Sequence, residues 1–396
     1  MGLNATPSAE RVHIGIFGKR NAGKSSLINA MTGQELAIVS DIAGTTTDPV
    51  TKAMELLPLG PVVMIDTPGL DDTGELGAQR VRKAMQVMNR CDLAVVAIDA
   101  LEGQTDAHTD LLTRLTAKNI PHVIAMNKCD LLDTVPPDTE QVRYVSATTG
   151  AGIYDLKEKI AHLVPSGNNG RRIVADLLQP NDFVVLVVPI DSAAPKGRLI
   201  LPQQQTIRDI LEAGACSIVC RETELASTLE KLGQPPRMVI TDSQAFASVS
   251  KDTPQDVPLT SFSILMARYK GRLESAVHGV RTLETLQDGD TVLISEGCTH
   301  HRQCDDIGTV KLPRWIKEYT GKNLNFAFTS GGEFPDDLTP YQLIVHCGGC
   351  MLNEREMKYR IARAQDDGVP MTNYGILISY INGILERAIE PLADSL

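Results

Sequence analysis

The sequence has no apolar run long enough to cross a membrane, since its longest apolar stretches, such as Phe183–Val188, have only the length of a strand. Its N-terminus lacks the basic patch and apolar core of a secretory signal. It also has no long basic run, and its net charge of −11 argues against a nucleic-acid backbone as the main partner. We therefore expect a cytoplasmic protein that binds neither membrane nor nucleic acid.

One ordinary hydrophobic core cannot accommodate 396 residues, so two or three domains are expected. A hydrophobic content of 42% and a charged content of 22% are typical of a soluble globular protein. In the cytoplasm, eight cysteines are more often core residues, metal ligands or redox groups than disulfides.

A phosphate-binding loop is the clearest motif in the chain. Residues Gly18–Ser25 fit the pattern G-x-x-x-x-G-K-[ST] without a mismatch, between an apolar run at Val12–Phe17 and a helical pattern at Ser26–Met31. Glycines let successive backbone N–H groups surround an anionic phosphate chain, and the helix N-terminus adds a favourable dipole. In this arrangement Lys24 reaches the β- and γ-phosphates and the Ser25 hydroxyl binds Mg²⁺.

Residues 12–165 alternate strand and helix, as a nucleotide-binding α/β domain should. Further strands are predicted at Val62–Ile65, Asp92–Ile98, His122–Met126 and Arg143–Val145. Each of these runs ends at a polar motif, so the motifs should gather at the carboxyl edge of the sheet. Asp66 then suits the Mg²⁺ shell, and the N–H of Gly69 can meet a γ-phosphate.

A base-binding motif follows the later strands. The segment Asn127–Asp130 places a carboxylate, Asp130, where it can accept hydrogen bonds from the N–H and NH₂ edge of guanine. The segment Ser146–Thr148 closes the base pocket. A further threonine-rich segment, Asp41–Asp48, lies between the first helix and the second strand and is predicted to be a mobile loop.

With these four ordered motifs, the first domain resembles the translation-factor-like GTPases, specifically the branch that contains Era and TrmE. The resemblance implies guanine specificity, a Thr46 that binds Mg²⁺ when GTP is present, and an Asn21 that serves K⁺-stimulated hydrolysis. Candidate K⁺ contacts are Ser40, Ile42 and Thr45, while the alternative interpretation of Asn21 is a polar residue that braces the turn. The implied nucleotide-binding residues are Gly18, Asn21, Ala22, Gly23, Lys24, Ser25, Ser26, Thr45, Thr46, Asp66, Gly69, Asn127, Lys128, Asp130, Ser146 and Ala147.

The chain departs from Ras-like enzymes after Gly69, where Leu70 replaces the glutamine that orients the attacking water. We therefore expect GTP hydrolysis to be intrinsically slow or to be catalysed by another group. Glu75 is a candidate for positioning water, and an exposed glutamate at a helix start is the alternative. The residues expected to serve hydrolysis are Lys24, Thr46, Gly69 and Glu75. Such a GTPase suits switching, because γ-phosphate contacts order loops that hydrolysis releases.

A polar, glycine-rich segment at Ser166–Gly170 reads as a linker to a second, smaller α/β domain. Strands are expected at Phe183–Val188, Cys216–Cys220 and Met238–Ile240, separated by helical patterns. We interpret Cys216 and Cys220 as core residues, because free cysteine is usually buried. The domain shows no catalytic constellation, so we expect it to serve association, as a homodimer.

A long helical pattern, Phe262–Leu286, leads into the last domain, where two strands run into cysteine motifs. A strand at Thr291–Ile294 precedes a loop with Glu296, Cys298, His300, His301 and Cys304, and a strand at Tyr341–Val345 precedes His346–Cys350. If these strands are parallel neighbours, both loops meet at the sheet edge where α/β folds bind ligands.

The residue types in these motifs do not decide between zinc and an iron–sulfur cluster. Structural zinc needs four closed ligands, which Cys298, His300, Cys347 and Cys350 provide. An iron–sulfur cluster is also held by thiolates. Three thiolates beside several candidate fourth ligands suit a cluster with one exchangeable iron; those candidates are His300, His301, His346, Cys304 and Glu296. Cys304 is equally interpretable as a loop thiol without a metal role.

The order of motifs, with Asn21 in a GTPase domain, then Cys-x-His and a distant His-Cys-x-x-Cys, resembles the [FeFe]-hydrogenase maturation GTPases of the HydF family over the whole chain. The resemblance implies a [4Fe-4S] cluster on Cys298, Cys347 and Cys350, with a labile fourth site near His300 and His346. It also implies a scaffold that receives a transient di-iron precursor, made with radical-SAM maturases, and transfers it to the apo-[FeFe]-hydrogenase.

We therefore predict an α/β protein with a P-loop GTPase domain at 1–167, a dimerisation domain at 168–265 and an iron–sulfur domain at 266–396. One alternative is a tRNA- or ribosome-associated GTPase with a zinc-binding last domain, against which the acidic charge weighs. A radical-SAM enzyme is a further alternative, but it needs a compact C-x-x-x-C-x-x-C run that the sequence lacks.

Overall fold

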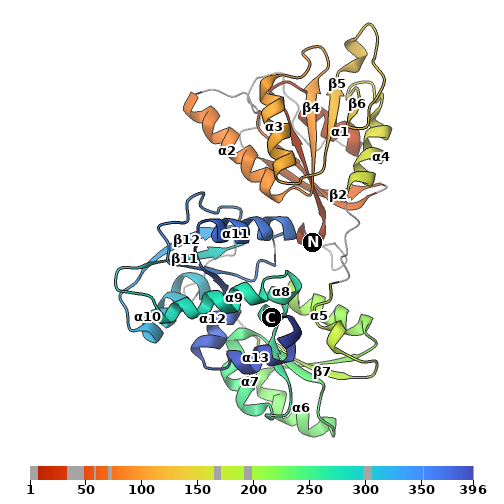
Figure 1. The fold of residues 1–396 in the computed structure, drawn as a ribbon. Coiled ribbons are helices and arrows are strands. Elements are labelled where there is room, and N and C mark those ends of the chain that lie inside the picture. The colour runs from red at the N-terminus through yellow and green to blue at the C-terminus, as the bar shows by residue number, and fades with distance from the viewer. Residues whose placement is uncertain are drawn as a thin grey trace. The chain divides into compact units, whose positions relative to one another are not determined.

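The computed structural model describes residues 8–33, 49–57, 59–69, 74–164, 171–190, 199–297, 306–350 and 352–395. The chain forms two compact units, of which the first is Met1–Asn169 with Asn353–Tyr359 and the second is Gly170–Leu352 with Arg360–Leu396 (Figure 1). Both are α/β, as the sequence predicts. The three-domain boundaries at 167/168 and 265/266 stay a prediction.

The first unit is built on a six-stranded sheet in the order β2-β3-β1-β4-β5-β6. All neighbours in it are parallel except β2 and β3. Its strands are β1 Val12–Phe17, β2 Val50–Leu56, β3 Gly60–Asp66, β4 Leu93–Asp99, β5 His122–Asn127 and β6 Val142–Tyr144. Its helices are α1 Lys24–Thr32, α2 Gly74–Arg90, α3 Asp106–Ala117 and α4 Ile153–Leu163. The strands expected from the sequence are thus all present, within two residues at each end.

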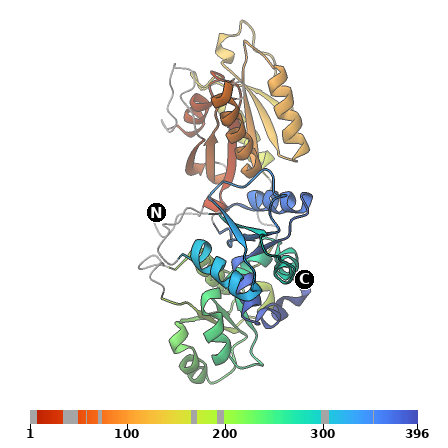
Figure 2. The ribbon, with the colours of Figure 1, turned by 90° about the vertical axis from the view of Figure 1, so that its left-hand side faces the viewer.

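The pattern of buried residues explains why both faces of this sheet are covered. Along β3, Val62 and Met64 pack into one apolar cluster, whereas Val63 and Ile65 pack into another. Residues of α1 and α4 complete the first cluster and residues of α2 and α3 the second, so the sheet lies between two helix pairs (Figures 1 and 2). A parallel sheet needs such double cover, and its strands therefore read as continuous apolar runs.

The second unit contains two parallel four-stranded sheets, in the orders β10-β9-β7-β8 and β12-β11-β13-β14. The first has β7 Phe183–Val187, β8 Cys216–Cys220, β9 Met238–Thr241 and β10 Leu259–Ser261, with α5 Leu201–Glu212, α6 Leu225–Leu232, α7 Phe246–Asp252 and α8 Phe262–Tyr269. The second has β11 Thr291–Glu296, β12 Asn325–Ser330, β13 Leu343–His346 and β14 Met371–Asn373, with α9 Leu273–Val280, α10 Leu312–Thr320, α11 Glu354–Asp366, α12 Tyr374–Ile381 and α13 Leu385–Ile389.

Both units also contain short helices. A π-helix at Ile307–Lys311 runs directly into α10. The 3₁₀ helices are Ser8–Glu10, Cys129–Leu131, Ala175–Leu177, Glu222–Glu224, Ser243–Ala245, Arg281–Glu284 and Glu390–Ser395.

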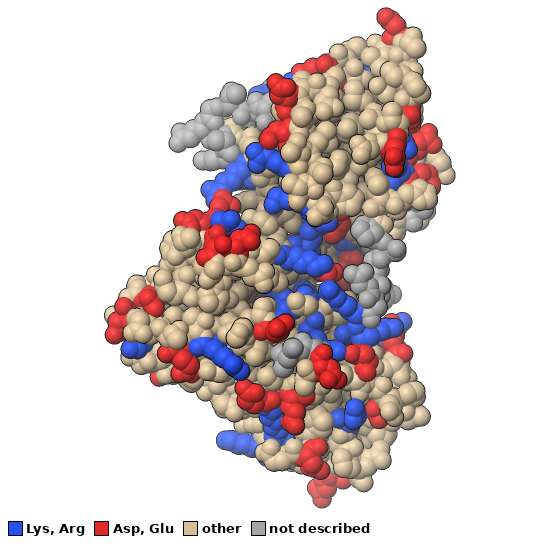
Figure 3. Space-filling model, viewed as in Figure 1, with Lys and Arg blue, Asp and Glu red and all other residues tan. Residues whose placement is uncertain are grey.

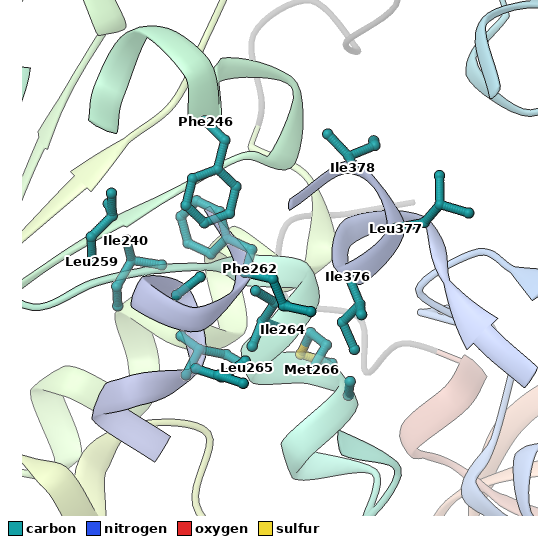
Figure 4. Close-up of a cluster of buried hydrophobic side chains, with 14 of the residues drawn as sticks. Ile240, Phe246, Leu259, Phe262, Ile264, Leu265, Met266, Ile376, Leu377 and Ile378 are labelled. Atoms are coloured by element: carbon teal, nitrogen blue, oxygen red, sulfur yellow. The ribbon is translucent and has the colours of Figure 1, made fainter. Parts of the chain in front are cut away.

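A single hydrophobic core joins the two sheets of the second unit. Figure 4 shows Phe262, Ile264 and Met266 of α8 beside Ile376 of α12, with Phe246 of α7 close by. All five side chains are at most 3% exposed. The second and third predicted domains therefore share their interior.

Two sequence-based expectations were wrong in this unit. The helical pattern Phe262–Leu286 is not one helix: it breaks between α8 and α9, where Gly271 adopts a left-handed φ of +67°. Cys216 is exposed and Cys220 only half-buried, because β8 is the edge strand of its sheet. Plain core packing therefore does not describe Cys216.

No helix among the described residues is long and apolar enough to cross a membrane. On the face in Figure 3, both acidic and basic side chains are present on each unit. The net charge of −11 is thus not spread as a uniform acidic surface.

Candidate functional site

The phosphate loop has the backbone that its glycines predict. Gly18, Asn21 and Gly23 all have positive φ, at 150°, 59° and 81°. A Cβ on Gly18 would lie 2.2 Å from the carbonyl oxygen of Ala97, so only glycine fits there. Asn21 is exposed, and asparagine tolerates the left-handed region better than most residues. The loop therefore turns tightly from β1 into α1, while buried Ala22 anchors its centre.

Lys24 begins α1 and is 9% exposed. Its Nζ donates to the carbonyl oxygens of Gly18 at 3.1 Å and Lys19 at 2.7 Å. These bonds hold the ammonium over the loop where a phosphate chain would lie. Ser26, one residue beyond Ser25 in α1, is half-buried.

Ser25 and Asp66 come together although 41 residues separate them. The Ser25 hydroxyl donates to Asp66 Oδ2 at 2.6 Å, and Oδ1 of the same carboxylate is buried without a hydrogen-bond partner among the described residues. Burial raises the pKa of Asp66, against the opposing effects of the Ser25 hydrogen bond and the charge of Lys24. An orphaned carboxylate oxygen beside a hydroxyl is the oxygen-donor set that Mg²⁺ prefers. Gly69, three residues after Asp66, is buried.

Asn127 connects the phosphate loop to the predicted base pocket. It is 2% exposed; its Nδ2 donates to Ala22 O at 3.0 Å, and its Oδ1 accepts the N–H of Ala147 at 3.0 Å. A Cβ on Gly23 would lie 2.2 Å from Asn127 Nδ2. Ser146 is fully buried, and its hydroxyl oxygen accepts the N–H of Thr149 at 3.0 Å.

Lys128 and Asp130 follow this buried asparagine in the chain. Lys128 has a φ of +65°, and its Nζ donates to Asp99 Oδ2 at 2.6 Å. Burial is the largest single effect on Asp99 and would raise its pKa, but the hydrogen bonds from Lys128 and from backbone N–H groups, together with the Lys128 charge, outweigh it and the pKa is lowered. Asp130 is exposed, so its carboxylate is accessible to a base. The Lys128–Asp99 contact was not predicted from the sequence, although Asp99 ends β4 just as Asp66 ends β3.

Several predicted residues fall outside this description. Those outside the described residues are Ser40, Ile42, Thr45, Thr46, Leu70, Cys298, His300, His301 and Cys304. Glu75 lies in α2, but its side chain is not described.

The second candidate site lies at the carboxyl ends of β11 and β13, which are parallel neighbours as the sequence predicts. The chain goes from β11 to β12 on one side and then returns to β13 on the other, so the strand order reverses between these two strands. Open α/β sheets bind ligands at such switch points. Gly297 follows β11 and Cys347 follows β13, and the Gly297 N–H donates to Cys347 Sγ at 3.0 Å.

The Cys347 sulfur is held as an acceptor. Besides Gly297, the N–H of Gly349 approaches it at 3.4 Å. A Cβ on Gly297 would lie 2.8 Å from the Leu352 side chain, so glycine permits the close approach of the two loops. Cys350 is half-buried, like Cys347. Two N–H groups directed at one sulfur stabilise a thiolate, the form of cysteine that binds metals.

His346 is engaged elsewhere. It is fully buried; its Nδ1–H donates to Cys347 O at 2.7 Å, and its Nε2 accepts from Arg360 at 3.1 Å. Burial lowers the pKa of His346, so the ring is neutral at pH 7. Arg360, itself fully buried, also donates to Gly331 O at 2.9 Å. In this arrangement neither ring nitrogen of His346 is directed at a metal.

Glu296 ends β11 beside a buried phenol. Tyr374 donates its hydroxyl to Glu296 Oε1 at 3.2 Å, and burial followed by the Glu296 charge raises the Tyr374 pKa. Gly308, in the π-helix, packs so closely that a Cβ there would lie 2.3 Å from Glu296 Oε1. A π-helical segment often marks a functional site. Tyr374 was not predicted, because nothing in the sequence links it to Glu296.

Two further cations contact the Cys347–Cys350 loop and were also missed. Arg272 is 4% exposed and donates to Gly348 O at 3.1 Å. Lys270 donates to Gly349 O and, at 3.2 Å, to Leu352 O. Burial lowers the pKa of Arg272 to about 10, so its guanidinium stays charged at pH 7.

No group of three or more His, Cys, Asp or Glu side chains forms a metal site within the part of the chain that the structure describes. Cys347 lies beside its two amide donors and Cys350 follows it in the same loop, whereas Cys298 falls outside that part. The ligand set implied by the resemblance therefore stays a prediction.

Comparison with known protein families shows to which family the chain belongs. Residues 173–271 match the family model of the hydrogen maturase F dimerization domain, and residues 274–391 match that of the hydrogen maturase F tetramerization domain. Together these matches cover more than half of the 396 residues. The chain belongs to the hydrogen maturase F (HydF) family. In this HydF chain both strands that precede the cysteine loops lie in the tetramerization domain, and residues 13–128 match the model of the 50S ribosome-binding GTPases.

Curated relatives match part of this HydF chain. The tRNA modification GTPase MnmE of Chromobacterium violaceum is 37% identical over 160 residues, which are 39% of this chain and 35% of that protein. MnmE of a Picosynechococcus species is 30% identical over 237 residues, which are 58% of this chain and 49% of that protein. The chain thus spans about a third to a half of the length of these relatives.

Solved structures are more distant. Era of Aquifex aeolicus, bound to GDP and AlF₄⁻, is 20% identical with a TM-score of 0.37, covering 54% of this chain and 94% of that chain. NFeoB of S. thermophilus, bound to GDP and AlF₄⁻, is 24% identical with a TM-score of 0.33, covering 39% and 63%. Similarity at this level carries no functional information.

Proposed function

We propose that this HydF chain hydrolyses GTP with Mg²⁺ as cofactor, at a slow intrinsic rate that K⁺ stimulates. The observation that carries this proposal is the Ser25–Asp66 contact of 2.6 Å, beside an Asp66 Oδ1 that has no hydrogen-bond partner among the described residues. A bound Mg²⁺ would neutralise charge on the β- and γ-phosphates. Lys24 would exchange its two carbonyl partners for phosphate oxygens.

Base selection falls to the exposed Asp130, whose carboxylate accepts from the N–H and NH₂ groups of guanine. Asn127 fixes the position of this pocket relative to the phosphate loop through its bonds to Ala22 and Ala147. Asn21, exposed in the loop, offers an amide oxygen for K⁺.

The GTPase proposal is tested by phosphate release from GTP in KCl and in NaCl. We expect Mg²⁺-dependent release that is faster in KCl, and near-complete loss in Ser25→Ala, which lacks the Mg²⁺-binding hydroxyl. Equal rates in the two salts would contradict the K⁺ assignment alone. Full activity in Ser25→Ala would contradict the proposed Mg²⁺ site.

We further propose that Cys298, Cys347 and Cys350 hold a [4Fe-4S] cluster. Support comes from the Cys347 sulfur, which accepts N–H groups at a strand-order switch point in the tetramerization domain. A cluster held by three thiolates leaves one iron open to an exchangeable ligand. Among the described residues, Glu296 suits that iron better than His346, because a carboxylate has two oxygens that can coordinate, whereas both ring nitrogens of His346 make hydrogen bonds. His300, His301 and Cys304, which lie outside the described residues, stay candidates.

In this proposal the protein is a scaffold: it receives a di-iron precursor made with radical-SAM maturases and delivers it to the apo-[FeFe]-hydrogenase, with the nucleotide state altering partner binding. The support is the pairing of a switch-type GTPase domain with a thiolate site in one chain. If the GTP- and GDP-bound forms bind each partner with equal affinity, the switching role is wrong.

The cluster proposal is tested by anaerobic purification with iron and zinc analysis and EPR of the reduced protein. We expect about four irons per chain and a reduced [4Fe-4S] signal, lost or altered in Cys298→Ala. Stoichiometric zinc with no iron after reconstitution would instead indicate a zinc-stabilised GTPase.

A further inference from the structure

The turn between α8 and α9 contacts the cysteine loop through two cations. Arg272 donates to Gly348 O at 3.1 Å, and Lys270 donates to Gly349 O and Leu352 O. These three carbonyls lie on either side of Cys350 in the chain. The two side chains therefore fix the backbone that carries Cys347 and Cys350.

The local structure gives no helical reason for an arginine at position 272. Arg272 is the N-cap residue of α9, yet its side chain makes no cap hydrogen bond. Small polar side chains are preferred at an N-cap, and a cation there opposes the helix dipole. The side chain is also 4% exposed, and burying a cation costs free energy unless its surroundings compensate. The hydrogen bond to the cysteine loop provides part of that compensation.

The turn itself is fixed on its other side. Arg268 donates to Ile173 O at 3.2 Å and forms a two-pronged ion pair with Asp176. Gly271 has a φ of +67°, and a Cβ there would lie 3.6 Å from the Arg171 guanidinium. The turn thus rests on the segment that begins the dimerization domain and has little freedom to move away from the cysteine loop.

We propose that Lys270 and Arg272 are positioning residues that clamp the cysteine loop in its metal-binding conformation and place two positive charges beside its thiolates. The cluster part of this inference rests on the proposed function, whereas the clamping part concerns the protein alone. Thiolates bound to a cluster give it a negative net charge, which reduction increases. Nearby cations favour the reduced form and so raise the reduction potential.

The first test is hydrogen exchange in the metal-free full-length protein. The N–H of Cys347 donates to Ser295 O at 2.9 Å and that of Leu352 to Gly349 O at 3.1 Å, so both amides report on the loop. We expect Arg272→Gln and Lys270→Met to exchange these amides roughly tenfold faster, the effect of losing a hydrogen bond from a charged group. Arg281→Gln is the matched control, because Arg281 is the exposed C-cap residue of the same helix.

The second test is the midpoint potential of the reconstituted cluster. We expect Arg272→Gln to shift it to more negative values and Arg272→Lys, which keeps the charge, to restore much of the shift. If circular dichroism shows that Arg272→Gln does not fold, hydrogen exchange and the midpoint potential are measured on Lys270→Met and Arg272→Lys instead. Unchanged exchange of the loop amides in the folded variants would overturn the clamp.

The outcomes separate the two proposals. A wild-type protein that takes up no iron contradicts the proposed cluster, while the exchange experiment still decides the clamp. A wild-type cluster whose potential does not respond to Arg272→Gln overturns the electrostatic part of the inference and leaves the proposed function intact.

Discussion

Gly23→Ala should weaken nucleotide binding through a single methyl group. Gly23 is the N-cap residue of α1 with a φ of 81°, and an added Cβ would lie 2.2 Å from Asn127 Nδ2. The left-handed backbone costs an L-residue about 1–2 kcal/mol. Displacing Asn127 loses its bonds to Ala22 and Ala147, at roughly 1 kcal/mol each. We therefore expect the first unit to lose about 3–4 kcal/mol of stability.

Gly33→Ala is the matched control at the other end of the same helix. Gly33 is the C-cap residue of α1 with a φ of 65°, but an added Cβ meets nothing within 4 Å among the described residues. This variant carries the backbone cost without the collision. The difference between the two variants, about 2 kcal/mol, isolates the effect of displacing Asn127.

The assay combines a fluorescent GDP analogue with urea unfolding. A loss of about 2 kcal/mol at the base pocket predicts roughly 30-fold weaker binding by Gly23→Ala, with near-normal binding by Gly33→Ala. The single tryptophan, Trp315, lies in α10 of the second unit, so its fluorescence transition should be the same in both variants. Equal affinity and equal stability of the two variants would refute the role assigned to Asn127.

Three further predictions concern buried or charged groups. Burial raises the pKa of Asp66, so the folded state holds this proton more tightly than the unfolded state, and the nucleotide-free protein loses stability as the pH rises through that pKa. In urea titrations at several pH values, Asp66→Asn should remove this loss of stability. The same variant should bind Mg²⁺ at least about tenfold more weakly. Arg360→Met removes the donor that His346 Nε2 and Gly331 O share, which should lower the free energy of unfolding by roughly 2–4 kcal/mol. The urea midpoint reported by Trp315 should fall accordingly, and the control variant Arg281→Gln should keep the wild-type midpoint. Asp130→Asn should weaken GTP and favour xanthosine triphosphate in competition binding, since an amide NH₂ can donate to the xanthine carbonyl; unaltered base preference would contradict the assignment of Asp130.

The parts of the site that the sequence predicted are those that follow from local order. The phosphate loop is contiguous, and Asp66 and Asn127 sit at the ends of parallel strands, so alternation of strand and helix is enough to bring them together. The same reasoning placed the loops that follow β11 and β13 at one sheet edge. Their confirmation as neighbours needed only the sheet order β11-β13.

The missed residues depend on long-range packing. Arg272 and Tyr374 reach the cysteine site from helices distant in sequence, and no periodicity marks a buried arginine at an N-cap. Gly271 interrupts a helical pattern that its neighbours support, because one left-handed residue outweighs the propensity of a whole segment. Cys216 is exposed because its strand happens to be the sheet edge, a property of topology rather than of composition.

The continuous interior beneath the two sheets of the second unit has a consequence for assembly. Phe262 and Met266 of the dimerization domain are buried against residues of α12 in the tetramerization domain, so neither domain can be excised without exposing the other's interior. Because the two domains share one core, any surface with which the dimerization domain associates keeps a fixed orientation to any such surface of the tetramerization domain within the same chain.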